Sequence, residues 1–185
     1  MTATSLDLGR PTAGDVIELI LDDHRRFETL LRQLRDSSSD RDSVRRAFSA
    51  LHVAHAEAEE KHVYPGFRTE RAIEDHEKHH GEEEHAEGNE ALLAVLELNG
   101  TDTQAFDDAV EELSRLVNHH LAEEELTILN PARSEVSEAA RARLGEAFAT
   151  ERNALIDADC GRIENVRALV VQAKSEGVID ESQAE

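Results

Sequence analysis

Two segments of the chain combine histidine and glutamate at a spacing that suits metal binding. The first, HAEAEEKHVYP, places His55 and Glu59 four residues apart, and the second, HHLAEEELTILNP, places His120 and Glu124 at the same spacing. Residues four apart lie on one face of a helix, so each pair can chelate a metal ion. A proline follows each pair. The repeated arrangement predicts one buried metal site to which two helices contribute.

Two further histidines fall at positions that helical periodicity assigns to the interior. His24 lies between Ile20 and Phe27 in an apolar stripe with spacings of three and four residues. His85 is reached by counting back along the helical period from the apolar half of its own segment. His80 lies on a neighbouring line of the same segment, so His85 is the first choice on this helix and His80 the second.

The carboxylates strengthen the metal hypothesis, because an ionised group without a partner costs several kcal/mol to bury. No lysine or arginine occurs at the same level of these inward stripes, so a metal ion is the expected partner. The second segment has one more residue between glutamate and proline than the first, which leaves Glu123 and Glu125 as alternatives to Glu124. The candidate metal ligands are His24, His55, Glu59, His85, His120 and Glu124.

The donor set indicates the kind of metal. Imidazole and carboxylate without sulfur suit iron, manganese or zinc better than copper(I), and the set is too rich in nitrogen for calcium or magnesium. Iron is the expected metal, with manganese and zinc as alternatives. The spacing alone does not decide between one nearly saturated ion and two ions bridged by the carboxylates.

The elements that must position these residues are all helices. Ala, Leu, Glu and Arg dominate the chain and only three prolines occur, which predicts an all-α fold. Pro65–Gly66 and Asn130–Pro131 are expected to end the second and fourth helices. The expected organisation is a flexible tail over 1–13, a four-helix metal-binding bundle over 14–131, and a C-terminal extension of one or two helices over 132–185 packed on the bundle. The expected helices are 15–35, about 43–63, a third of uncertain ends before Asn99, 101–130, a fifth from Ser134 or Ser137 to about 157, and about 162–174.

Composition excludes several classes of partner. The chain of 185 residues has 20 Lys and Arg against 41 Asp and Glu, a formal charge of −21 that repels nucleic acid. Cys160 is the only cysteine, which fits a reducing cytoplasm. The sequence shows neither an export signal nor 18 consecutive apolar residues, so we expect a cytoplasmic protein with no membrane partner.

The four ligand segments resemble the hemerythrin-like HHE cation-binding family over about residues 15 to 131. The resemblance lies in DHRRFETLL, HAEAEEKHVYP, EHAEGNEALL and HHLAEEELTILNP. It implies an up-down four-helix bundle that binds non-haem iron, commonly as a bridged pair, through the six candidate ligands. It also implies binding or sensing of O2 or another small diatomic or redox species, with an unknown redox partner. Oxygen-carrying members have a His-x-x-x-His pair on the third helix, which His76 and His80 imitate.

Two other classes of function stay open at this point. One is a diiron enzyme, either peroxidase-like, catalase-like or nitric oxide-reducing, or a ferritin-like oxidase. A ferritin-like site needs Glu-x-x-His on two helices, and Glu59-x-x-His62, Glu77-x-x-His80 and Glu82-x-x-His85 have that local form. The other class is a metal-free acidic bundle that serves as an interaction module.

Overall fold

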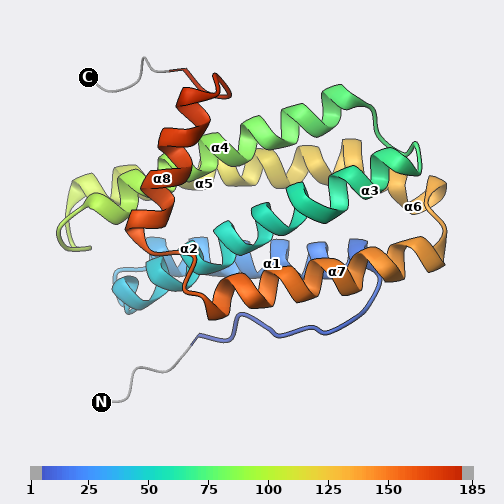
Figure 1. The fold of residues 1–185 in the computed structure, drawn as a ribbon. Coiled ribbons are helices and arrows are strands. Elements are labelled where there is room, and N and C mark those ends of the chain that lie inside the picture. The colour runs from blue at the N-terminus through green and yellow to red at the C-terminus, as the bar shows by residue number, and fades with distance from the viewer. Residues whose placement is uncertain (1–5, 181–185) are drawn as a thin grey trace.

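A computed structural model describes residues 6–180 of the chain, and within them every regular element is helical (Figure 1). Four long helices form a bundle in which each packs against the next one along the chain and the last returns to the first. The expected all-α bundle is therefore confirmed. The bundle helices are α1 (Val16–Arg35), α2 (Arg41–Ala58), α4 (Asp75–Glu97) and α5 (Gln104–Glu124).

Side chains at the N-termini fix where the helices start. Asp15, Asp40 and Thr103 each accept a hydrogen bond from a backbone N–H in the first turn of α1, α2 and α5. Glu74 and Glu77 form a reciprocal capping box at the start of α4. These caps satisfy backbone donors that have no partner within the helix. Because Asp40 acts as the cap, α2 begins two residues earlier than the sequence predicts.

The expectation that Pro65 and Pro131 end their helices is wrong. After α2, a π-helical turn, η1 (Glu59–Val63), leads into the short helix α3 (Tyr64–Thr69). After α5, the turn η2 (Glu125–Leu129) leads in the same way into α6 (Asn130–Glu135). Each proline is thereby placed in the first turn of a new helix, where its missing N–H costs nothing. Both π-turns lie beside the histidine–glutamate pairs.

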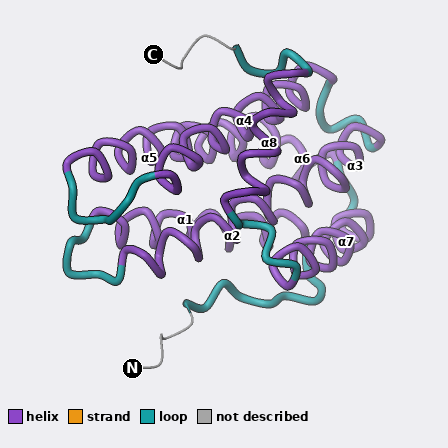
Figure 2. Tube along the Cα trace, turned by 60° about the vertical axis from the view of Figure 1, so that its left-hand side comes forward, coloured by secondary structure: helices purple, strands orange, loops and turns teal. Residues whose placement is uncertain are grey.

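Two C-terminal helices cover parts of the bundle. The helix α7 (Glu138–Asp157), capped by Ser137, packs along α1 and α2, and α8 (Ile163–Ser175) crosses α4 (Figures 1 and 2). Residues 6–14 run beside α7, where Asn153 donates a hydrogen bond to the carbonyl of Pro11. The division into a tail, a bundle and an extension stays a prediction. No helix among residues 6–180 is both long and apolar enough to cross a bilayer.

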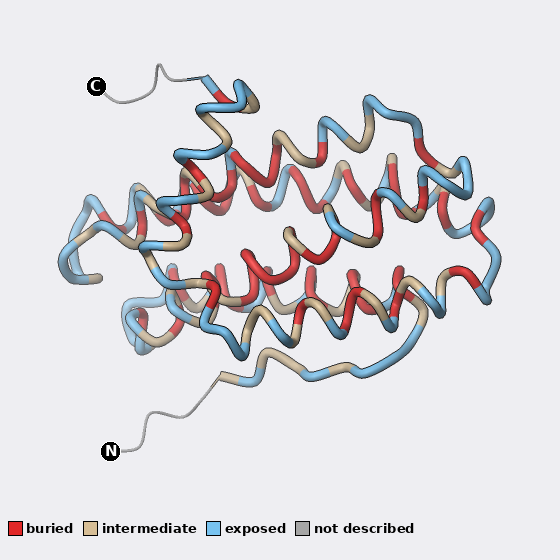
Figure 3. Tube along the Cα trace, in the orientation of Figure 1, coloured by how far each residue is buried: buried red, intermediate tan, exposed pale blue. Residues whose placement is uncertain are grey.

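Buried residues line the inward faces of the helices (Figure 3). The apolar ones form two large clusters, and a third, small cluster joins α4 and α8. One large cluster contains Phe27, Phe48 and Leu92, and the other large cluster contains Ile20 and Phe148. The apolar stripe of α1 contributes to both large clusters, and His24 interrupts it between Ile20 and Phe27. The candidate ligands therefore lie at mid-height of the bundle, with apolar side chains on both sides.

Gly145 allows the close contact between α7 and the start of α1. A Cβ atom at this position would collide with the backbone carbonyl of Gly14. We expect Gly145→Ala to lower the free energy of unfolding by about 1–3 kcal/mol, because backbone atoms cannot move aside cheaply. Urea unfolding checks this, with Ala142→Ser on the exposed face of α7 as the control. Equal stability of the two variants would contradict this account of the packing.

Candidate metal centre

The structure brings all six predicted ligands together inside the bundle. Each is buried, and their side chains form two overlapping groups that share Glu59. In each group the candidate donor atoms lie within 4.8 Å of one another. The groups are His24, His55, Glu59 and Glu124 in one, and Glu59, His85 and His120 in the other.

Glu59 lies between histidines of two adjacent helices. It is the first residue of η1, and its side chain is fully buried. Its Oε2 atom lies 3.2 Å from His55 Nε2 of α2 and 3.3 Å from His85 Nε2 of α4. One carboxylate therefore faces two imidazole nitrogens at distances that suit shared coordination of metal.

Glu124 occupies the equivalent place on the opposite side of the layer. Its Oε2 atom lies 3.2 Å from His24 Nε2 of α1 and 3.9 Å from His120 Nε2 of its own helix. Its Oε1 atom accepts a hydrogen bond of 3.0 Å from the buried hydroxyl of Tyr64. The two segments with repeated sequence thus supply two carboxylates, each facing a pair of histidines.

A carboxylate outside the inner group holds each of the four imidazole rings. If Nδ1 donates to a carboxylate, the neutral ring presents the lone pair of Nε2 to the interior. The pairs and their distances from Nδ1 are His24 with Glu125 (2.8 Å), His55 with Asp23 (3.3 Å), His85 with Glu60 (2.9 Å) and His120 with Glu84 (2.9 Å).

The inward-facing atoms have no hydrogen-bond partner among the described residues. They are the Nε2 atoms of all four histidines, both carboxylate oxygens of Glu59 and Oε2 of Glu124. Leaving buried polar atoms unpaired costs about 1–3 kcal/mol for each group, and more for charged ones. A metal ion would satisfy imidazole nitrogens and carboxylate oxygens at once, so these residues fit a metal centre.

Arg152 supports the centre from α7, which the sequence analysis did not anticipate. This arginine is fully buried, and its Nε and Nη2 atoms donate hydrogen bonds of 2.5 and 2.8 Å to Asp23. Asp23 in turn lies 3.3 Å from Nδ1 of His55. Arg152 follows Phe148 by four residues, so the helical period of α7 already assigned it to the inward face.

The alternative ligands left open by the sequence lie outside the inner group. His85, not His80, joins the inner group, whereas His80 is half-exposed at the surface. Glu125 contacts Nδ1 of His24, and Glu123 lies near the surface, so Glu124 is the inward carboxylate.

The helix α4 contains two glycines at points of close contact with neighbouring side chains. The helix passes through Gly81 and Gly88 without a break. A Cβ atom at Gly81 would lie 3.0 Å from the Tyr64 hydroxyl, and one at Gly88 would lie 3.0 Å from the ring of His52. These glycines therefore let Tyr64 of α3 and His52 of α2 approach α4 closely.

A cavity of about 10 Å³ lies beside the inner histidines. This is roughly the volume that one water-sized molecule needs on the same measure. Phe27, His52, His55, His85 and His120 are among the residues that line the cavity. The Nε2 atom of His52 is buried and has no hydrogen-bond partner among residues 6–180.

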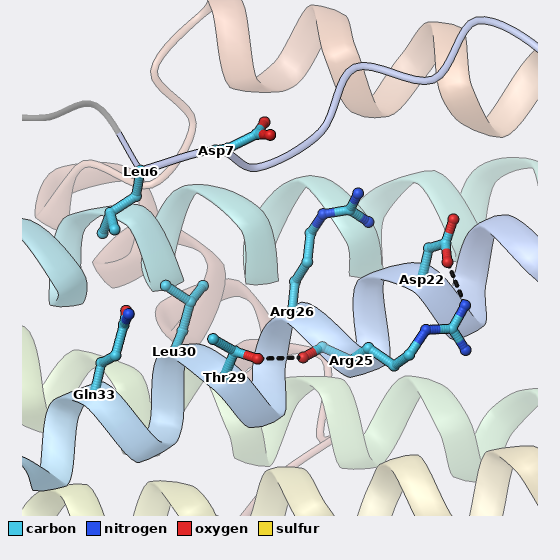
Figure 4. Close-up of a pocket in the computed structure, with 8 residues that line it drawn as sticks. All are labelled: Leu6, Asp7, Asp22, Arg25, Arg26, Thr29, Leu30 and Gln33. Carbon is cyan, nitrogen blue, oxygen red and sulfur yellow. Dashed lines mark hydrogen bonds and ion pairs between the residues drawn. The ribbon is translucent and has the colours of Figure 1, made fainter.

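A larger hollow of about 430 Å³ opens on the outer face of α1 (Figure 4). Residues 6–7 and the exposed side of α1 line it, including Asp22, Arg25 and Gln33. None of its lining residues is a histidine, and none of the six candidate ligands contributes to it. The hollow is therefore separate from the candidate metal centre in the interior of the bundle.

Two of the inner histidines, His55 and His85, have pKa values above the ordinary histidine value when no metal is present. Burial disfavours their charged form, but Glu59 and Asp23 outweigh it and raise the pKa of His55 to about 9. Glu59 and Glu60 likewise overcome burial and raise the pKa of His85 to about 10. Burial also opposes ionisation of Glu59, yet His55 and His85 hold the pKa of this carboxyl well below its usual range.

The fold and the site together define a helical bundle with a buried histidine and carboxylate centre that suits a cation. The family model of the hemerythrin HHE cation binding domain matches residues 15–132. The chain therefore belongs to the hemerythrin HHE cation-binding family. Searches among curated proteins and among solved structures gave no significant match.

We expect Arg152→Leu to lower the free energy of unfolding by about 3–5 kcal/mol, because the buried carboxylate of Asp23 loses its closest positive partner and keeps only the longer contacts to Arg26 (3.4 Å) and His55 (3.3 Å). Urea unfolding measures the effect. Arg143→Leu, at an exposed position of the same helix, is the control. The double variant Asp23→Asn with Arg152→Leu is expected to lose less stability than the two single changes added together. Strict additivity would show that the two side chains do not depend on each other.

The pKa values of His55 and His85 predict how the metal-free protein responds to alkaline pH. Both values lie above the roughly 6.5 of an unfolded histidine, so the stabilisation is complete below about pH 6.5 and is lost as pH rises through about 9 to 10. The melting temperature in the presence of a chelator is therefore expected to fall by several degrees between pH 7 and pH 10.

The variants His85→Gln and His79→Gln separate this effect from general charge repulsion. His79 is exposed on the same helix and should leave the alkaline decline unchanged. His85→Gln should make the decline smaller, because it removes one of the buried imidazoles whose raised pKa causes the decline. A decline of the same size in both variants would contradict the assignment.

Proposed function

We propose that the protein binds two iron ions at the inner centre and a small diatomic ligand, O2 in the first place, beside them. The observation that carries the proposal is the set of buried, unpaired imidazole and carboxylate atoms that point at one another. Two overlapping groups that share Glu59 support a pair of ions more than a single one. His24, His55 and Glu124 would hold one ion and His85 and His120 the other, and Glu59 belongs to both groups.

The donor set supports iron as the metal. Four imidazoles and two carboxylates without a thiolate match non-haem iron, and manganese and zinc accept the same donors. Membership of a cation-binding family supports a resident metal but does not name it. When bound, iron supplies one-electron redox chemistry and open coordination positions.

The residues of this chain would perform three tasks around the metal. The outer carboxylates, such as Glu60 and Glu125, hold the imidazole rings and favour nitrogen lone pairs that point inward. Tyr64 fixes Glu124 through its hydroxyl. The apolar clusters on both sides exclude water, which strengthens electrostatic interactions within the layer and slows side reactions.

The cavity beside His52 supports a small ligand as the physiological partner. Its volume of about 10 Å³ admits only a ligand of a few atoms without rearrangement. Burial and the neighbouring His85, His55 and His120 hold the pKa of His52 well below its usual value, so this imidazole stays neutral. A neutral imidazole has one N–H donor, which can hydrogen-bond to a bound diatomic ligand.

A ferritin-like set of ligands receives no support from this arrangement. His24 occupies the place on α1 where that set needs a glutamate. Glu82, the glutamate of the Glu82-x-x-His85 motif, pairs with Lys78 away from the centre. His62 lies beside Glu151 rather than in the inner group.

Iron analysis of the purified protein and of the variant Glu59→Gln tests the proposal. We expect about two iron ions per wild-type chain and a loss of at least half of them in the variant, because Glu59 belongs to both groups. His62→Ala, which changes a histidine outside the centre, should keep the wild-type iron content. Elemental analysis and the visible absorption spectrum provide the two readouts.

Exposure of the reduced protein to O2 then distinguishes binding from turnover. A visible charge-transfer band that forms with O2 and is lost on its removal supports ligand binding. Steady consumption of peroxide or nitric oxide would instead assign an enzyme. A wild-type protein that takes up no iron, manganese or zinc would leave only the acidic interaction module.

A further inference from the structure

A second group of histidines and glutamates lies at the surface where α4 and α5 pack together. His80 and Glu84 belong to α4, and His119 and Glu123 belong to α5. His80 Nε2 lies 3.2 Å from Glu123 Oε1 and 3.8 Å from Glu84 Oε1. His119 Nε2 lies 3.6 Å from Glu84 Oε1 and 3.3 Å from Glu123 Oε2. Two imidazoles thus face the same two carboxylates.

Glu84 distinguishes this group from an ordinary charged surface. Only 9% of the residue is exposed, and its Oε1 atom is buried and has no hydrogen-bond partner in the described part of the chain. Its other oxygen, Oε2, is occupied by Nδ1 of His120. Within residues 6–180, no lysine or arginine lies within 4.0 Å of the carboxylate of Glu84 or Glu123. The buried oxygen of Glu84 therefore faces two histidines but no permanently charged lysine or arginine.

We propose that His80, Glu84 and Glu123 bind one divalent transition-metal ion at this surface, with His119 beside them as a further donor. The donor atoms of the first three residues all lie within 4.8 Å of one another. Imidazole and carboxylate without sulfur are donors for Zn²⁺, Fe²⁺ and Mn²⁺. Ligands of a tetrahedral ion with bonds of about 2.0–2.2 Å are separated by roughly 3.3–3.6 Å, close to the distances found here.

This outer site differs from the inner centre in its access to solvent. The side chain of His80 is 50% exposed and that of Glu123 is 34% exposed, whereas all six inner residues are buried. An ion held here exchanges with solvent without any opening of the bundle. None of the three ligands belongs to the inner six, although Glu84 also contacts Nδ1 of His120 through its other oxygen.

Titration of the full-length, iron-loaded protein with Zn²⁺ tests the outer site. Wild-type protein is expected to bind one Zn²⁺ per chain while its iron content stays constant. His80→Ala and Glu123→Gln should weaken this binding by at least about tenfold, because each removes a ligand. His79→Ala is the matched control, because His79 is an exposed neighbour on the same helix that pairs with Glu83 instead.

Three results would overturn the inference. They are no Zn²⁺ binding by the wild-type protein, equal binding by wild type and His80→Ala, and an equal loss in His79→Ala. If the proposed iron centre is wrong, the wild-type protein will contain little iron, which is measured separately from Zn²⁺ binding. In that case a Zn²⁺ step that His80→Ala removes and His79→Ala keeps would still establish the outer site.

Discussion

Burial of two carboxylates in one layer with four imidazoles is the constraint on which the rest of this structure depends. Glu59 and Glu124 are almost fully buried, and the chain supplies neither of them with a lysine or arginine partner among residues 6–180. Two carboxylates without a counter-charge would strongly oppose folding. Protonated histidines can compensate them without metal, and a bound cation compensates them while leaving the imidazoles neutral. The layer is therefore stable in either form, but only with positive charge inside it.

The paired glutamates show how neighbouring helices are tied to this layer. In each repeated segment one glutamate faces the interior, and the next residue reaches a histidine of another helix. Glu60 contacts His85 of α4, and Glu125 contacts His24 of α1. The π-turns begin at or directly after the inward glutamate, so the helix widens where two successive side chains must serve two rings. The same residues thus position ligands and connect helices.

Local periodicity made the fold and the inner histidines predictable. Contacts between residues far apart in the chain could not be predicted in this way. His24 and His85 stand in helical stripes, and a stripe can be read without knowing its neighbours. The π-turns were missed because a proline usually ends a helix, and only the structure shows a new helix starting around Pro65. The pairing of Arg152 with Asp23 joins residues 129 positions apart, which no local pattern reveals.

The family match ends at residue 132, but the support of the centre continues beyond it. Phe148 of α7 places its ring edge-on to His55, with ring centroids 5.8 Å apart, and Arg152 neutralises Asp23 behind the same histidine. Without α7, Asp23 would lose its contact with Arg152, and His55 would lose part of its apolar cover. The matched region alone would therefore hold His55 less rigidly than the whole chain does. The helix α7 is therefore part of the framework of the candidate centre, although it contributes none of the six inner residues.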